Sequence, residues 1–161
     1  MLSTPDLSDL NPGAQALPFQ FQRVGRKVSC QGPIATVACF EDNSRVKEAV
    51  SEPGNGRVLL VDGSRSLRRA LTGDLVAASA MENGWAGMVI IGAIRDVEVI
   101  ATFDFAVFAL GTSPIKTEKF GRGERDVALE FDGLDFSVEP GQFLAADANG
   151  VLINKMPFLI E

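Results

Sequence analysis

The pattern of apolar and polar positions predicts a strand, a helix and a second strand near the middle of the chain. Residues 57–62 and 87–92 are apolar runs, rich in branched side chains and too short for helices, so each predicts a buried strand. Between them, Thr72-Gly73-Asp74 begins a segment of small and apolar residues that ends at Asn83-Gly84, which is typical of a helix.

The first part of the chain carries further signals of the same kind. Thr4-Pro5-Asp6 starts a short helix, and Asp42-Asn43-Ser44 starts another, which Pro53-Gly54-Asn55-Gly56 ends. Residues 27–40 are β-like and are interrupted by Gln31-Gly32, so we expect two strands there.

The second half of the chain is rich in strands and turns. Its apolar segments predict five strands, at residues 106–110, 127–131, 134–138, 143–146 and 150–154. Asp132-Gly133 predicts a hairpin turn, and residues 116–125, which mix basic side chains with Glu and Gly, predict a solvated loop. The whole pattern predicts an α/β sandwich with an early parallel βαβ unit and antiparallel strands late, forming one domain over residues 1–161.

Two acidic motifs follow the two central strands. A strand, helix, strand unit almost always forms a right-handed crossover with parallel strands, so the carboxyl ends of both strands lie at one edge. Gly73-Asp74-Leu75 follows the first strand and Arg95-Asp96 the second, with twenty residues between Asp74 and Arg95. We therefore expect both motifs at one sheet edge, where open α/β sheets bind ligands.

The residue types at this edge predict a site for a small 2-oxo acid. The backbone amides from Gly73 to Val76 would bind a carboxylate at the helix N-terminus, and Arg95 would add a forked, charged donor. Asp96, with Asp74 acting through water, would hold Mg²⁺ or Mn²⁺, which prefer oxygen ligands. Such a metal together with a guanidinium would stabilise an enolate, as cleavage of a carbon–carbon bond beside a 2-oxo acid requires.

A purely structural interpretation stays open at this stage. Asp74 would compensate the helix dipole, Asp96 would cap a turn beginning at Val97, and Arg95 would pair with one of the 21 acids.

The amino-acid composition limits the catalytic groups, metal ligands and binding partners that the protein can have. The chain has no His, which excludes Ser-His and Cys-His nucleophiles and His-ligated metals. Cys30 and Cys39 lack the spacing of a zinc site and are expected to be small buried residues. The net charge of -6 argues against direct nucleic-acid binding. No segment has the length and apolarity of a membrane span or a secretion signal, so we expect a soluble, cytoplasmic protein.

The motifs together resemble the RraA family over nearly the whole chain. The resemblance rests on Cys39-Phe40-Glu41-Asp42-Asn43, Val61-Asp62-Gly63, Leu67-Arg68-Arg69-Ala70-Leu71, Gly73-Asp74-Leu75, Asn83-Gly84-Trp85, Gly92-Ala93-Ile94-Arg95-Asp96 and Ala146-Asp147-Ala148-Asn149-Gly150.

This family includes regulators of ribonuclease activity and metal-dependent 4-hydroxy-4-methyl-2-oxoglutarate aldolases. The resemblance implies a ββα sandwich of the swivelling-domain type, a homotrimer with sites between subunits, and pyruvate-like substrate bound by the amides from Gly73 to Val76 and by Arg95, with the divalent metal at Asp96. It implies retro-aldol cleavage of 4-hydroxy-4-methyl-2-oxoglutarate to two pyruvates, accompanied by oxaloacetate decarboxylation.

The chain departs from the family pattern in two ways. Many relatives have a run of glycines where this chain has Gly63-Ser64-Arg65, which puts a bulky cation near the expected pocket mouth. Characterised aldolases tend to be longer, with a C-terminal helix that offers an acid to the neighbouring subunit, and the ribonuclease regulators share the shorter length seen here. The alternative function is therefore a non-catalytic protein that binds and inhibits a ribonuclease of the RNase E type or its assembly.

Overall fold

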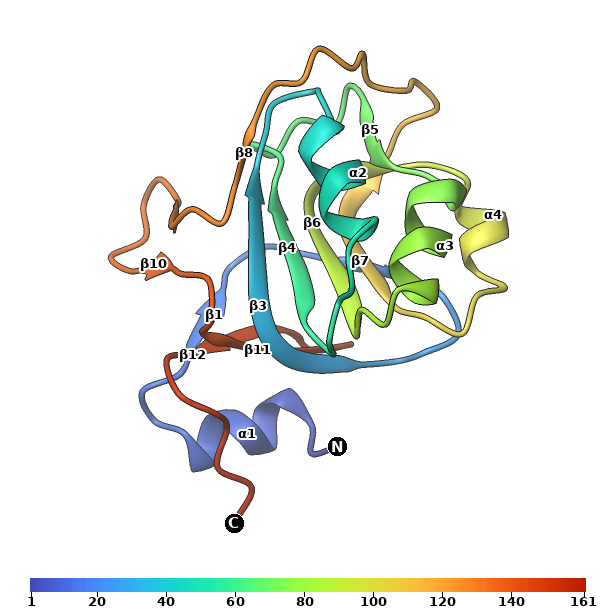
Figure 1. Ribbon diagram of the computed structural model, residues 1–161. Helices are drawn as coiled ribbons and strands as arrows, with labels where there is room; N and C mark the ends of the chain where they lie inside the picture. The colour runs from blue at the N-terminus through green and yellow to red at the C-terminus, as the bar shows by residue number, and fades with distance from the viewer.

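Ten strands pair into one curled, mixed sheet in the computed structural model, which describes residues 1–161 (Figure 1). The strand order is β1-β12-β11-β3-β4-β6-β7-β2, with β5 beside β6 and β8 beside β3, and β9 and β10 form a separate pair. The strands are β1 (Gln15–Leu17), β2 (Gln22–Val24), β3 (Cys30–Ala38), β4 (Val58–Asp62), β5 (Ala70–Thr72), β6 (Gly87–Ile94), β7 (Val107–Thr112), β8 (Glu124–Arg125), β9 (Leu129–Glu130), β10 (Ser137–Val138), β11 (Phe143–Asp147) and β12 (Gly150–Asn154). The helices are α1 (Thr4–Leu10), α2 (Ser44–Val50), α3 (Asp74–Glu82) and α4 (Val97–Ile100).

The centre of the sheet is parallel and its flank is antiparallel. β3, β4, β6 and β7 run parallel, whereas β11 and β12 join antiparallel beyond β3. The predicted parallel crossover is confirmed, since Leu60 of β4 lies opposite Val89 of β6. The predicted α/β class, with parallel strands early and antiparallel strands late, is also confirmed.

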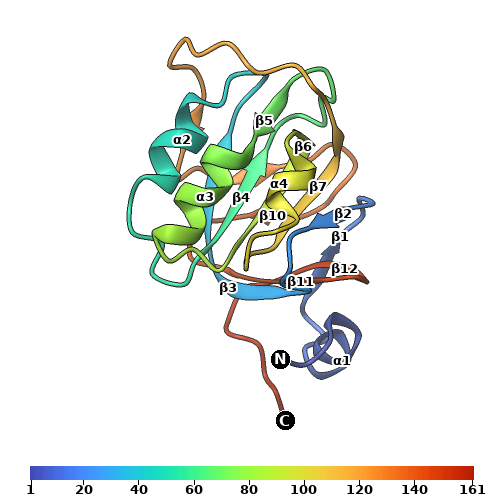
Figure 2. The same cartoon turned by 90° about the vertical axis from the view of Figure 1, so that its right-hand side faces the viewer.

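Alternating side chains of the central strands build two cores. Leu59 and Val61 point to the face covered by α2, α3 and α4, and Val58 and Leu60 point to the face enclosed by the curled antiparallel strands (Figure 2). All four side chains are fully buried. Each contributes about 1.5–3 kcal/mol by leaving water, which fixes the sheet that carries the site.

Helix α1 closes the far end of the molecule, beneath β11 and β12 in Figure 2. Leu7 packs with Leu152 and Phe158, and the backbone amide and Oγ1 of Thr4 each donate to Asp147 over 2.7 Å. This end lies opposite the loops at the carboxyl ends of the central strands.

The prediction of two strands broken at Gln31-Gly32 is wrong, because β3 is continuous through them. Gln31 and Gly32 pair with β11, and from Ile34 onward the strand pairs with β4. A Cβ on Gly32 would lie 2.2 Å from the carbonyl oxygen of Gly56, so the glycine permits a close backbone approach and does not break the strand.

Other differences concern short elements that have no strong pattern. β1, β2, β5 and β8 were not predicted, and β8 lies inside the segment expected to be a solvated loop. The turn at Asp132-Gly133 forms, with the Leu134 amide donating to the Phe131 carbonyl, but strand pairing begins only at Glu130 and Ser137. None of the four helices has the length and apolarity that crossing a membrane requires.

Candidate functional site

The end of β6 brings the two acidic motifs side by side. The Arg95 amide donates to the Thr72 carbonyl over 2.9 Å, which continues the pairing of β5 with β6. Because Gly73 follows Thr72 directly, the start of α3 lies against Arg95 and Asp96.

Asp96 binds the N-terminus of α3 instead of capping its own helix. Its backbone is left-handed, with φ 58° and ψ 36°, and its side chain makes no capping hydrogen bond to α4. Its Oδ2 atom accepts a hydrogen bond from the Asp74 amide over 3.1 Å. The interpretation that Asp96 caps the turn at Val97 is therefore wrong for the side chain.

Gly73 is needed because the Asp96 carboxylate passes so close to it. A Cβ at position 73 would lie 2.6 Å from Oδ2 of Asp96 and 3.5 Å from Nε of Arg95. Its φ of -121° is ordinary, so a close approach and not backbone conformation requires the glycine here.

The amides at the start of α3 are partly occupied by the protein's own carboxylates. The Asp74 amide donates to Asp96, and the Leu75 amide donates to Oδ1 of Asp74 over 2.9 Å, whereas the Gly73 amide donates to no group of the chain. The Leu75 side chain is 81% exposed beside these amides, and Val76 is buried in the core beneath the helices. Thr72 directly precedes Gly73 in the chain, and its Oγ1 is a buried side-chain atom that has no hydrogen-bond partner.

Arg95 keeps most of its donors free. Its closest carboxylate atom is Oδ2 of the adjacent Asp96, 3.9 Å from Nε, and Nη1 donates to the Pro114 carbonyl over a long 3.4 Å. A hollow of about 360 Å³ lies beside it, also lined by Asp96, Glu98 and Ser113. The guanidinium is thus available to an anion that enters this hollow.

Asp96 has the exposure and the free oxygen that a metal ligand requires. Its side chain is 34% exposed, and its Oδ1 atom accepts no hydrogen bond. No three His, Cys, Asp or Glu side chains gather closely enough to hold a metal ion by themselves. Mg²⁺ commonly keeps several waters and binds through one or two carboxylates plus the substrate, so a single carboxylate fits that mode of binding.

Arg65, which the sequence placed near the pocket mouth, contacts a different part of the molecule. Ser64 and Arg65 are both left-handed, with φ 56° and 60°. The Arg65 guanidinium lies 5.5 Å from the centre of the Phe19 ring and lines a small cavity with Glu130 and Asp132. It does not line the hollow beside Arg95.

Sequence reasoning missed a buried hydrogen-bond cluster that holds residues 114–122 over this edge. The Asp42 carboxylate accepts from the amide and hydroxyl of Ser44 on one oxygen, and from the amides of Phe120 and Arg122 on the other. Burial on its own raises the pKa of Asp42, but these hydrogen bonds outweigh it and lower the pKa to about 2.

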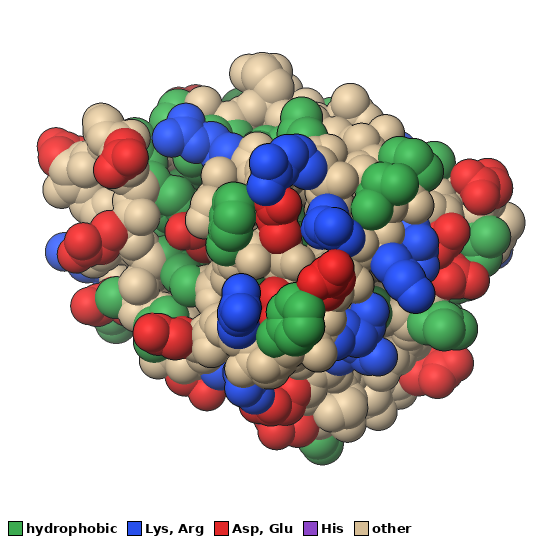
Figure 3. Space-filling view, turned by 90° about the horizontal axis from the view of Figure 1, so that it is seen from above, with side chains coloured by type: hydrophobic (Ala, Val, Ile, Leu, Met, Phe, Trp, Pro, Cys, Tyr) green, Lys and Arg blue, Asp and Glu red, His purple; other side chains and the backbone are tan.

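Asn43 and Thr117 hold the same segment a few residues earlier. Thr117 Oγ1 donates to Asn43 Oδ1 over 2.9 Å, and the Asn43 side chain donates to the Leu71 carbonyl. The available sequence signal is Asp42-Asn43-Ser44, which predicts a helix start and contributes to the family resemblance but does not indicate a contact with residues 114–122. Figure 3 looks onto this edge from above and shows Lys and Arg side chains gathered around a few acidic ones.

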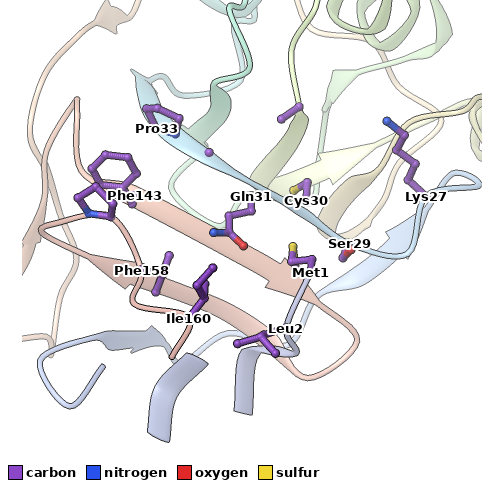
Figure 4. A pocket seen from close by; sticks show the side chains of 13 residues that line it. Met1, Leu2, Lys27, Ser29, Cys30, Gln31, Pro33, Phe143, Phe158 and Ile160 are labelled. Atoms are coloured by element: carbon purple, nitrogen blue, oxygen red, sulfur yellow. The ribbon is translucent and has the colours of Figure 1, made fainter. Parts of the chain in front are cut away.

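A larger apolar hollow lies at the opposite end and lacks acid–base chemistry. Its volume is about 650 Å³, and its lining includes Met1, Cys30, Phe143 and Phe158, with Lys27 as the charged residue (Figure 4). Burial is the main cause that raises the pKa of the Cys30 thiol to about 12, so the thiol stays protonated and unreactive at neutral pH.

Comparison with known proteins agrees with the fold and the motifs. The chain is 50% identical over 155 residues to a Pseudomonas fluorescens protein and 47% identical over 159 residues to one from Xanthomonas campestris, each named "Putative 4-hydroxy-4-methyl-2-oxoglutarate aldolase". The alignments cover 96% and 99% of this chain, and 94% and 95% of those proteins.

Two solved structures superpose closely on the chain. One is described as the RNA-processing inhibitor RraA from Thermus thermophilus, with TM-score 0.91, 43% identity and coverage of 98% of this chain and 94% of that one. The other, from Geobacillus kaustophilus, is described as an S-adenosylmethionine:2-dimethylmenaquinone methyltransferase, with TM-score 0.93, 44% identity and 99% coverage of both chains. The family model described as "RraA-like: Aldolase/RraA" matches residues 4–153, and the chain belongs to this RraA-like family.

Proposed function

We propose that this chain is a divalent-metal-dependent aldolase that cleaves 4-hydroxy-4-methyl-2-oxoglutarate to two pyruvates and also decarboxylates oxaloacetate. The observation that carries the proposal is that Asp96 and Arg95 line one hollow, while the Asp96 carboxylate is held by the amino end of α3. The names of the relatives at 47–50% identity support the same activity.

Both reactions break a carbon–carbon bond and leave its electron pair on pyruvate as an enolate. In the retro-aldol reaction the 4-hydroxyl loses its proton, the bond between C3 and C4 breaks, and C3 later receives a proton. In oxaloacetate decarboxylation, carbon dioxide leaves in place of the second pyruvate. The same stabilisation of enolate charge therefore serves both substrates.

Different residues of the chain bind the substrate, stabilise the enolate charge and accept the proton. The Arg95 guanidinium binds an oxygen of the 2-oxo acid end and stabilises the negative charge that develops there. The Gly73 amide, which donates to no group of the chain, offers a further donor beside it. The Asp74 carboxylate accepts the proton of the 4-hydroxyl through a water molecule.

The metal belongs at Asp96, whose Oδ1 atom is free. A bound Mg²⁺ or Mn²⁺ supplies Lewis-acid polarisation of the 2-oxo group.

The test is pyruvate release from oxaloacetate, with and without Mg²⁺ or Mn²⁺, in the wild type, Arg95→Ala and Asp96→Ala. We expect metal-dependent turnover that falls by at least about 100-fold in each variant, because each one removes a charge that stabilises the enolate. Metal-dependent rates that are unchanged in both variants would refute the assignment.

We further propose that the active protein is a cytoplasmic homotrimer whose sites lie between subunits. One protomer supplies a single free carboxylate oxygen at the expected metal position, so a site at a subunit boundary would gain ligands and shelter from water. Light scattering of the purified protein measures the state directly, and a monomer at micromolar concentration would contradict it.

A second candidate function is inhibition of a ribonuclease through protein binding. It is favoured by the likeness to the solved structure described as the RNA-processing inhibitor RraA, and by the net charge of -6, which suits a basic RNA-binding surface on the partner. Salt-sensitive binding to an RNase E type enzyme would support this function, and undiminished RNA cleavage at saturating protein would exclude it.

A further inference from the structure

Asn43 stands directly before helix α2 but does not cap it with its side chain. An asparagine at this position usually accepts a hydrogen bond from an amide of the first helical turn. Here its Nδ2 atom donates to the Leu71 carbonyl of β5, and its Oδ1 atom accepts from Thr117 Oγ1, each over 2.9 Å. Asn43 is 6% exposed and Thr117 is 2% exposed, so water does not compete for either bond. The carboxamide therefore joins β5 to residues 114–122.

This bridge requires a side chain that donates and accepts at once. The Leu71 carbonyl needs a donor, whereas the Thr117 hydroxyl, which also accepts from the Asn43 amide over 3.3 Å, needs an acceptor for its own proton. A carboxamide supplies both groups, and an ionised carboxylate of the same shape supplies only the acceptor. Asn43 is thus matched to two buried partners on different segments.

Both of the bridged segments contact Arg95. The carbonyl of Thr72, the last residue of β5, accepts from the Arg95 amide over 2.9 Å. The carbonyl of Pro114, where the second segment begins, accepts from Arg95 Nη1 over 3.4 Å. Asn43 does not line the hollow beside Arg95, so it reaches the site only through these two segments.

The site leaves little room for β5 to move. Gly73 follows β5 directly, and a Cβ on it would lie 2.6 Å from Oδ2 of Asp96 and 3.5 Å from Nε of Arg95. A shift of β5 therefore changes the distances from the Gly73 amide to both side chains together. Misplacement of a catalytic group by about 1 Å can lower a rate by about 100-fold.

We propose that Asn43 and Thr117 are positioning residues for the reaction. Their bridge to β5 fixes where Arg95 and the Gly73 amide meet the substrate. The inference rests on the proposed function and adds two residues that do not touch the substrate. Because neither residue is charged, its loss should lower turnover without changing the charge of the site.

Three substitutions and one matched control separate this role from a general loss of stability. Thr117→Val keeps the shape of threonine and removes the hydroxyl, whereas Thr117→Ser keeps the hydroxyl. Asn43→Ser shortens the side chain so that it cannot bridge both partners, and leaves a residue that is favoured before a helix. Thr36→Val is the control, because Thr36 is 1% exposed and its hydroxyl donates over 2.6 Å to the Val127 carbonyl, outside β5 and residues 114–122. Circular dichroism and thermal unfolding check that each variant is folded at the assay temperature.

The kinetic test measures decarboxylation of oxaloacetate with Mg²⁺. In Thr117→Val and Asn43→Ser, kcat should fall about tenfold with KM changed by less than about threefold, because the displaced guanidinium still binds the substrate but no longer meets the developing charge. Thr117→Ser and Thr36→Val should keep kcat within about a factor of two of the wild type. Equal values of kcat in Thr117→Val and Thr36→Val would overturn the inference, because loss of a buried hydroxyl alone would then explain both.

Amide hydrogen exchange tests the same bridge without any need for turnover. The Arg95 amide donates to the Thr72 carbonyl, so its exchange reports whether β5 stays paired with the end of β6. It should exchange about tenfold faster in Thr117→Val and Asn43→Ser, and at the wild-type rate in Thr36→Val. If the wild type does not turn over oxaloacetate, the aldolase assignment fails, and this exchange pattern alone decides whether the bridge holds Arg95. Exchange at the wild-type rate in both bridge variants would overturn the inference.

Discussion

The Asp96 carboxylate accepts a hydrogen bond from the Asp74 backbone amide over 3.1 Å, across 22 positions of sequence. The bond joins the end of β6 to the start of α3 and holds the candidate metal ligand at a helix N-terminus, where negative charge is stabilised. It also places a left-handed residue, with φ 58°, at the centre of the candidate site. The Asp96 side chain therefore has both a structural role and a proposed role in metal binding, and substitutions at this position can distinguish the two.

Asp96→Asn and Asp96→Ala should differ in stability but not in activity. Asparagine tolerates the left-handed backbone and can still accept from the Asp74 amide, so the free energy of unfolding should fall by less than about 1 kcal/mol. Alanine loses the cap and strains the backbone, for a loss of about 2–3 kcal/mol. Urea unfolding measures both changes, and metal-dependent turnover should be absent in both variants. Equal stability of the two variants would contradict the role assigned to the backbone at this position.

Gly73→Ala should inactivate the site by steric overlap with the Asp96 carboxylate, although the substitution removes no charge. The new Cβ would lie 2.6 Å from Asp96 Oδ2, so the carboxylate must shift away from position 73, and we expect this to weaken its hydrogen bond with the Asp74 amide. We expect a loss of about 1–3 kcal/mol in the free energy of unfolding and a fall in turnover comparable to that of Asp96→Ala. Gly13→Ala is the matched control, because nothing lies within 4 Å of a Cβ there. Full activity in Gly73→Ala would show that the close approach is dispensable.

The sequence predicted the parallel core and the meeting of the two motifs because both depend on strong local signals. β4 and β6 are uninterrupted apolar runs, and the handedness of the crossover then leaves one arrangement for the segments that follow them. The contact between Asp96 and the Asp74 amide could not be predicted in this way, because it depends on the left-handed backbone of residue 96.

The missed features depend on contacts between distant segments. Nothing in the pattern near Gly32 indicates that the Gly56 backbone will pass beside it, so a continuous strand looked like two. Residues 116–125 were expected to be a solvated loop, because the partners that hold Thr117 and Phe120, Asn43 and Asp42, lie more than seventy residues earlier. Buried polar networks of this kind have no periodicity for a sequence to reveal.

Asp42 should make part of the stability of the protein sensitive to acid. Its folded-state pKa of about 2 lies below the ordinary value, so its stabilising contribution is fully present above pH 4 and is lost as the pH falls towards 2. The difference amounts to about 2 kcal/mol. Urea unfolding of the wild type and Asp42→Asn between pH 7 and pH 2 should show two curves that converge at low pH. Parallel curves over this range would rule out the hydrogen-bonded carboxylate as the cause.

Ser64→Gly should stabilise the protein, because the native φ of 56° is costly for serine and easy for glycine. The amide of residue 64 still donates to Asp62 Oδ1 in the variant, so only the strain and the Cβ are removed. We expect the free energy of unfolding to rise by about 1 kcal/mol. Ser29→Gly is the control, since residue 29 is not among the left-handed positions and glycine should lower stability there by about 0.5–1 kcal/mol. A gain at both positions, or at neither, would mean that left-handed strain at position 64 does not limit the stability of this loop.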